Sequence, residues 1–168
     1  MVTGAEHVGV TFASLMGAFP PSRAGEIAQM AQQLGYRSFW TAETTGPEAF
    51  SVLAAAGAAA PDMSLGTGVL ALQLRTPMVV AMAGATLQSL HPEADILLGI
   101  GISSPVVTSK WHGVPYGDRP LARVREYVTL VKEGLTGEAV TSNGAFYYGS
   151  RFRLGVRLGE KRPKGVVG

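Results

Sequence analysis

Apolar and polar positions alternate in blocks along most of this chain. Four short runs, at residues 7–13, 37–43, 64–72 and 95–102, are rich in apolar residues and have the length of strands. The last run, DILLGIGI, is apolar at nearly every position, which is typical of a strand buried on both faces of a parallel sheet. A segment of helical period follows each run, so the pattern predicts four β–α units in succession.

The segments between these runs have ordinary helix ends. Gly35 stands just after the first segment, where a left-handed residue commonly ends a helix. Thr76 followed by Pro77 has the form of an N-cap and a first helical residue. We therefore expect helices at residues 22–34, 47–60, 77–90 and 121–135.

The pattern changes after Gly137. Residues 139–156 alternate in polarity and contain Asn143-Gly144, the dipeptide most typical of a tight β-hairpin. Residues 157–168 have no clear period, so we expect an irregular tail there. The chain is thus predicted to be a single domain of four β–α units, followed by a hairpin and this tail.

Two architectures are compatible with this order of elements. One is a complete doubly wound sheet of four or five strands, as in a flavodoxin-like binding module. The other is half of a (β/α)8 barrel, whose full length is typically about 250 residues. Both need parallel strands joined by right-handed crossovers, so periodicity alone leaves the choice open.

The composition narrows the functional classes. The chain has 168 residues, of which 46% are hydrophobic and 15% charged, as in a globular domain. It contains no cysteine, which excludes disulfides, thiolate metal sites and cysteine nucleophiles from it. The net charge of +2 is small, and the basic residues between 151 and 164 are typical of a solvated tail, so no nucleic-acid partner is expected. No apolar run has the length of a membrane span and no secretory signal is evident, so we expect a cytoplasmic protein.

Several longer strings are specific enough to indicate a family. They are GYRSFWTAE at 35–43, SLGTGV at 64–69, RTPMVVAMAGATLQSL at 75–90, LLGIGIS at 97–103 and KWHGVPYGDRPLARVREYV at 110–128. In this order they resemble the luciferase-like monooxygenase superfamily, especially its deazaflavin-dependent members. The resemblance implies a TIM-type (β/α)8 barrel whose cofactor ring lies over the C-terminal ends of the strands. The implied cofactor is the deazaflavin coenzyme F(420), as first choice, or FMN, and the implied chemistry is hydride transfer or oxygen activation on a small organic substrate.

A complete member of that superfamily continues well beyond residue 168. In relatives, a segment similar to residues 152–164 leads into the fifth strand, whereas here it leads into GVVG and the sequence ends. The resemblance therefore implies an α/β fold truncated to about half a barrel, with the C-terminal hairpin added. We expect such a half barrel to self-associate, for example as a homodimer, through its exposed sheet edges.

Glu43 and Thr44 follow the second predicted strand, where barrel enzymes place catalytic groups. The resemblance implies an acidic residue and then an acid–base histidine at this point, but Thr44 does not titrate near neutral pH as imidazole does. Glu43 is thus either a polar site residue or a structural carboxylate at the barrel mouth. Trp40, inside the strand, either belongs to the core or stacks on the cofactor ring.

Two glycine-containing segments are candidates for cofactor contact. Thr67-Gly68-Val69 lies inside the third strand, where a glycine often marks a close approach by another group. The resemblance implies a cis peptide bond here that backs the cofactor ring, and packing inside the barrel is the alternative. Gly101 and Ser103 end the fourth strand without the third glycine of a dinucleotide-binding fingerprint, yet they leave the backbone open to a ligand.

The three histidines, His7, His91 and His112, lack the spacing of metal ligands, so no metal site is expected. Trp111 and His112 occupy the long loop after the fourth strand, where they either face the substrate or stabilise the loop. No serine, histidine and aspartate combination has the spacing of a hydrolase triad.

Three functional hypotheses follow. The first is a luciferase-like oxidoreductase that acts on a small-molecule substrate through a bound deazaflavin or FMN, in which the cofactor supplies the redox chemistry. The second is a non-catalytic half barrel, and the third is a complete flavodoxin-like binding module. The order of the strands and the position of the helices distinguish the barrel from the flavodoxin-like sheet.

Overall fold

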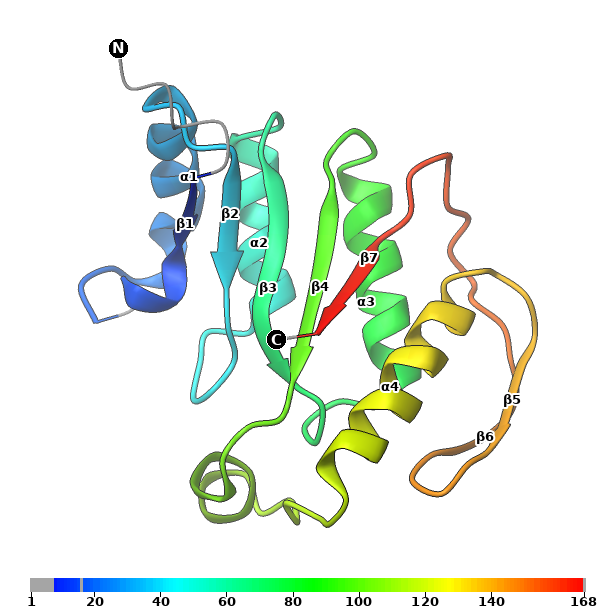
Figure 1. Ribbon diagram of the computed structural model, residues 1–168. Coiled ribbons are helices and arrows are strands. Elements are labelled where there is room, and N and C mark those ends of the chain that lie inside the picture. Colours follow the sequence, from blue (N-terminus) through cyan, green and yellow to red (C-terminus); the bar gives the residue numbers. More distant parts are fainter. Residues whose placement is uncertain (1–7, 16, 168) are drawn as a thin grey trace.

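The computed structural model describes residues 8–15 and 17–167, so His7 lies outside the described residues. A parallel sheet with the order β1-β2-β3-β4-β7 runs through the molecule (Figure 1). Its strands are β1 (Gly9–Thr11), β2 (Ser38–Thr41), β3 (Ser64–Ala71), β4 (Ile96–Gly101) and β7 (Lys164–Val167). The sequential order of the first four strands confirms the predicted barrel-type arrangement.

Four main helices connect the strands. They are α1 (Ala24–Gln33), α2 (Ala49–Ala59), α3 (Pro77–Leu90) and α4 (Pro120–Gly134). Figure 1 shows α1, α2 and α3 together behind the sheet, with α4 beside α3. A doubly wound sheet would place helices on both faces, so the flavodoxin-like alternative is wrong. Within the described part of the chain, no helix combines the length and hydrophobicity needed to cross a bilayer.

The helix starts follow local capping chemistry. The Thr76 hydroxyl accepts the N–H of Val79 at 3.3 Å, and Pro77 is the first residue of α3, as the sequence predicts. Helix α2 begins two residues later than Pro47. Its N-cap is Glu48, whose carboxylate accepts the N–H groups of Phe50 and Ser51 and thereby satisfies two donors of the first turn.

The core lies between the sheet and the helices behind it. Leu65, Leu98 and Ile100 are fully buried. The helices approach closely because small residues face the strands. A side chain at Gly84 of α3, for example, would meet Leu98 at 2.8 Å. The alanine-rich helices thus hold the strands in a tightly packed layer.

The predicted hairpin is present and consists of β5 (Val140–Asn143) and β6 (Tyr148–Phe152), which pair antiparallel. The turn is wider than a two-residue connection, because Asn143 pairs with Tyr148 across residues 144–147. The Glu126 carboxylate on α4 accepts the N–H groups of Ala145, Phe146 and Tyr147 within this turn. The Glu126 side chain therefore fastens the turn of the hairpin to helix α4.

The prediction of an irregular tail is wrong in part. Residues 164–167 form β7, which pairs parallel with β4 in the register Leu98↔Gly165 and Gly99↔Val166. A strand of four residues is too short to show a period, and the unpaired edge of β4 supplies the hydrogen-bonding partners that order it. The outer strands of the sheet are therefore β1 and β7.

Candidate active site

A cavity of about 260 Å³ opens at the C-terminal ends of β2, β3 and β4, and we call it the strand-end cavity. Its lining consists of Ala42, Glu43, Thr44, Gly68, Val69, Ala71, Ile102 and Ser103. Five of the residues singled out in the sequence are among them, brought together from three strands that are far apart in the chain. Parallel strands end at one edge of a sheet, which is why their following residues meet.

A second cavity, of about 520 Å³, lies next to the first, and we call it the rim cavity. Its lining consists of Glu43, Thr44, Gly46, Pro47, Glu48, Leu74, Arg75, Thr76, Val79 and His112. Glu43 and Thr44 line both cavities. The residues that follow β2, β3 and β4 therefore build one continuous region, with both polar and apolar lining, at this end of the sheet.

The backbone at Gly68 is open to the strand-end cavity. The Gly68–Val69 peptide bond is cis, as the resemblance implies. A Cβ at Gly68 would meet only the ring of Trp40, at 3.5 Å, which is an ordinary contact distance. Main-chain atoms are thus accessible from the cavity at this position.

Thr67 and Gly101 are buried and, unlike the other predicted cofactor-binding residues, do not line the strand-end cavity. The Thr67 hydroxyl is buried and donates to the carbonyl of Gly99 at 2.9 Å. Gly101 is also buried, and its carbonyl accepts the N–H of Leu72 at 3.1 Å. These two residues hold β3 and β4 together behind the cavity.

Trp40 lies over the glycines of the neighbouring strands. A Cβ at Gly66 would meet its ring at 2.4 Å, and one at Gly9 would meet Nε1 at 2.8 Å. The indole N–H donates to the Ser38 hydroxyl at 2.8 Å. The Trp40 ring is half-buried and packs across the sheet from β1 to β3, which supports its assignment to the packing of the barrel interior.

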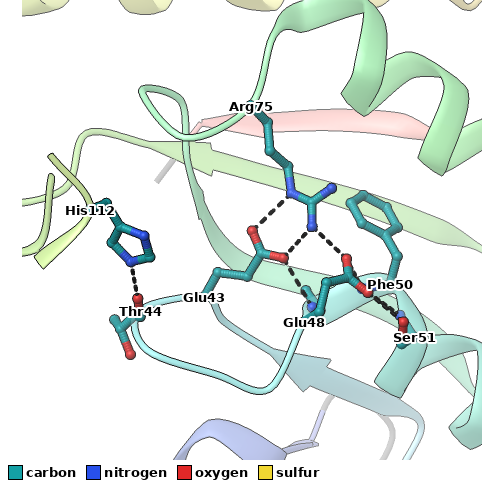
Figure 2. A network of polar contacts seen from close by, with 8 residues as sticks. Glu43, Thr44, Glu48, Phe50, Ser51, Arg75 and His112 are labelled. Carbon is teal, nitrogen blue, oxygen red and sulfur yellow. Dashed lines mark hydrogen bonds and ion pairs between the residues drawn. The ribbon is translucent and has the colours of Figure 1, made fainter. Parts of the chain in front are cut away.

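Glu43 is held by an ion pair with Arg75 (Figure 2). Arg75 Nε donates to Oε2 of Glu43 at 2.9 Å and Nη2 donates to Oε1 at 2.6 Å, while the Ala49 N–H donates to Oε1 at 3.0 Å. The pair is mostly buried, with 13% of the Glu43 side chain exposed and 19% of the Arg75 side chain. This environment favours the structural alternative for Glu43.

Arg75 also binds Glu48 and stacks over the ring of Phe50, 5.3 Å from its centroid. The hydrogen bond to Glu43 raises the pKa of Arg75 above its usual value. Burial opposes ionisation of Glu48, but hydrogen bonds from Ser51 and Phe50 together with the Arg75 charge outweigh it and lower the pKa of Glu48. The guanidinium therefore stays charged between the carboxylates of Glu43 and Glu48.

Helix α4 supports this network from behind. The Tyr127 hydroxyl donates to the Arg75 carbonyl at 2.9 Å, and burial raises the pKa of Tyr127 far above its usual value. Tyr127 also packs edge-to-face against Tyr147 of the hairpin, with ring centroids 5.4 Å apart. The roles of Arg75, Glu48 and Tyr127 are not evident from the sequence, because only the fold brings their partners within reach.

His112 connects the loop after β4 to the loop after β2. Its Nε2 hydrogen-bonds the Thr44 carbonyl, whereas the neighbouring Trp111 is exposed at the end of a π-helical turn, Val106–Trp111. His91 does not line either cavity, and its Nε2 hydrogen-bonds the carbonyl of Ala54 between α2 and α3. Within the described residues, no cluster of side chains has the composition of a metal site.

Comparison with known proteins identifies the family. The model of the luciferase-like monooxygenase family matches residues 3–166. The chain belongs to this family. A protein of Mycobacterium tuberculosis that is named as a coenzyme F(420)-dependent oxidoreductase is 39% identical over 132 residues, which are 78% of this chain and 38% of that protein.

Two solved structures of the same fold illustrate the range of cofactors. An F(420)-dependent secondary alcohol dehydrogenase, in complex with an F(420)-acetone adduct, superposes with a TM-score of 0.81 at 18% identity, over 96% of this chain and 51% of its own. The oxygenating constituent of a diketocamphane monooxygenase of Pseudomonas putida, in complex with FMN, superposes with a TM-score of 0.80 at 18% identity, over 97% of this chain and 51% of its own. The chain therefore spans about half of these barrels.

Proposed function

We propose that this chain forms the ring-binding half of an oxidoreductase site that uses deazaflavin coenzyme F(420), or FMN, to oxidise or reduce a small organic substrate. The observation that carries the proposal is the strand-end cavity, whose lining combines an open backbone at Gly68 with the hydroxyl-bearing residues Thr44 and Ser103. Membership of the luciferase-like monooxygenase family supports it. F(420) is the first choice because the curated relative described above is named for it.

The residues present fit a flat aromatic ring with polar edges. Gly68 and Val69 present main chain to one side of the cavity, without a side chain at Gly68 to obstruct it. Thr44 and Ser103 are placed to hydrogen-bond polar atoms on the ring edge, as hydroxyls donate and accept. When bound, such a cofactor supplies the capacity to accept or deliver two electrons with a hydrogen. The chain's own contribution is to position the ring and to shape the neighbouring rim cavity.

A titration of F(420) and of FMN into the purified 168-residue chain tests the proposal. We expect saturable quenching of cofactor fluorescence by the wild-type chain. Replacement of Gly68 with leucine fills the space in front of the main chain and should weaken binding about tenfold or more, equivalent to about 1.4 kcal/mol. The matched control is Gly149→Ala in the hairpin, where a Cβ has nothing within 4 Å.

Saturable binding that G68L weakens and G149A leaves unchanged is the expected result. Equal binding by all three proteins would place the ring elsewhere. No saturable binding of either cofactor to the wild-type chain would overturn the proposal.

A further inference from the structure

Among the described residues that line the two cavities, His112 carries the one imidazole. His112 caps the C-terminal end of the π-helical turn after β4. Its backbone N–H donates to the carbonyl of Val107 at 3.1 Å. Figure 2 shows the ring next to Thr44, to the left of the Glu43–Arg75 pair. The side chain is exposed, so a molecule in the rim cavity can reach it.

The hydrogen bond to Thr44 defines which ring nitrogen is basic. A carbonyl oxygen only accepts, so Nε2 of His112 must carry the hydrogen that points at the Thr44 carbonyl. In the neutral ring this leaves the lone pair on Nδ1. Figure 2 shows this second nitrogen on the side of the ring that is turned toward Glu43 and Arg75. The fold therefore orients a proton acceptor toward the rim cavity.

The other charged groups around the rim cavity are unsuited to moving a proton near neutral pH. Both carboxylate oxygens of Glu43 accept hydrogen bonds. The hydrogen bond to Glu43 raises the pKa of Arg75, and hydrogen bonds from Ser51 and Phe50 lower the pKa of Glu48, so both groups favour their charged forms. On the loop of His112 itself, Lys110 is an exposed cation. The threonine and serine hydroxyls of the two cavities do not titrate near neutral pH, whereas imidazole does.

We propose that His112 is a catalytic residue, the proton acceptor for oxidation of a small alcohol held in the rim cavity. This inference rests on the proposed function, because a deazaflavin or flavin must accept the electrons. The alcohol C–H bond breaks and its electron pair leaves with the hydrogen, as hydride, to that cofactor. The O–H proton passes to Nδ1 of His112, and the substrate becomes a carbonyl compound. In the reverse direction the imidazolium returns the proton as the carbonyl is reduced.

Nuclear magnetic resonance of the histidine rings tests the geometry without any turnover. The chain has three histidines, so their ring signals are readily assigned by substitution. We expect His112 to be the Nε2–H tautomer and its ring signals to shift when F(420) is added. The signals of His91, which contacts the carbonyl of Ala54, should stay unchanged and serve as an internal reference.

A kinetic comparison tests the role. H112Q keeps an amide N–H that can donate to the Thr44 carbonyl but has no basic nitrogen, and K110Q changes the charge of the same loop without touching the imidazole. With F(420) and isopropanol as probes, the wild-type chain should bleach the cofactor absorbance at a rate that rises with pH. We expect H112Q to lose this pH dependence and about 100-fold or more in rate, while its F(420) affinity and the rate of K110Q change less than about threefold.

The outcomes separate the inference from the proposed function. If F(420) binds but the His112 signals do not move, or if H112Q oxidises isopropanol like the wild type, the inference is overturned and the cofactor site stands. A proton on Nδ1 instead of Nε2 would also overturn it. If F(420) and FMN do not bind at all, both proposals fall together.

Discussion

The carboxylate of Glu43 and the guanidinium of Arg75 are 32 residues apart in the sequence and meet through two parallel hydrogen bonds of 2.9 and 2.6 Å. Glu43 comes from the loop after β2 and Arg75 from the loop after β3, so the pair fastens two neighbouring strand ends to each other (Figure 2). Thr44, which lines both cavities, is adjacent to this pair in the chain. The geometry of the candidate site therefore depends on an ion pair that need not take part in the chemistry.

Loss of the Arg75 charge should destabilise the fold. R75M leaves the mostly buried Glu43 carboxylate without its partner. Breaking such a pair costs about 3–5 kcal/mol when it is fully buried, so we expect a value near the lower end. Urea denaturation measures the change. The double variant E43Q/R75M removes both charges and should be more stable than R75M alone, whereas equal stabilities would show that the pair contributes little.

The loss of folding stability at acid pH should depend on the Glu48 carboxylate. Its pKa in the folded chain lies below its ordinary value of 4.5, so the folded state favours the ionised form. The resulting stabilisation is present above pH 4.5 and is lost as the pH falls through the folded-state pKa. E48Q should therefore reduce the fall in the free energy of unfolding below pH 4.5. The control variant E138Q, which changes an exposed glutamate, should leave that fall unchanged. A steeper fall in E48Q would contradict the assignment.

Glu126 should control the docking of the hairpin on α4. Its carboxylate accepts three N–H groups of the turn, at 3.1, 3.1 and 2.8 Å, and hydrogen bonds to a charged group contribute about 1.5–3 kcal/mol each at most. E126A should expose residues 140–152 to proteolysis while the sheet stays intact. Limited proteolysis followed by mass spectrometry detects this, with E133A on the same helix as the control. Equal cleavage of both variants would refute the role.

The chain should associate with a second copy through its outer strands. β1 and β7 each have one strand neighbour in the sheet, and such edges are templates for pairing. Val8, which precedes β1 and is 44% exposed, offers a place to add charge at one edge. V8K should shift the chain toward the monomer in size-exclusion chromatography with light scattering, while V106K, on the loop after β4, should not. A wild-type chain that stays monomeric at all concentrations tested would refute the prediction.

The sequence by itself determined the local elements and their order. Continuous apolar runs and helical periods depend on neighbouring residues, so the four strands, the four helices and the Thr76 cap of α3 were predictable. Five residues that line the strand-end cavity could also be singled out in the sequence, because the C-terminal ends of parallel strands always share one edge, whereas the predicted Thr67 and Gly101 do not line it. Residues such as Gly68 and Ser103 could therefore be placed together before any coordinates were known.

The tertiary structure alone decided the contacts between distant segments. β7 forms because the edge of β4 supplies its hydrogen-bonding partners. A segment of four residues is too short to show the alternation of apolar and polar residues that predicts a strand. In the sequence, nothing distinguishes Arg75 from other residues that precede a helix. Its role is evident only in the fold, which brings Glu43 and Glu48 to its guanidinium. The orientation of His112 likewise depends on the Thr44 carbonyl, 68 residues away. Ion pairs and hydrogen bonds of this kind need a precise approach in space, and no local pattern in the chain encodes that distance.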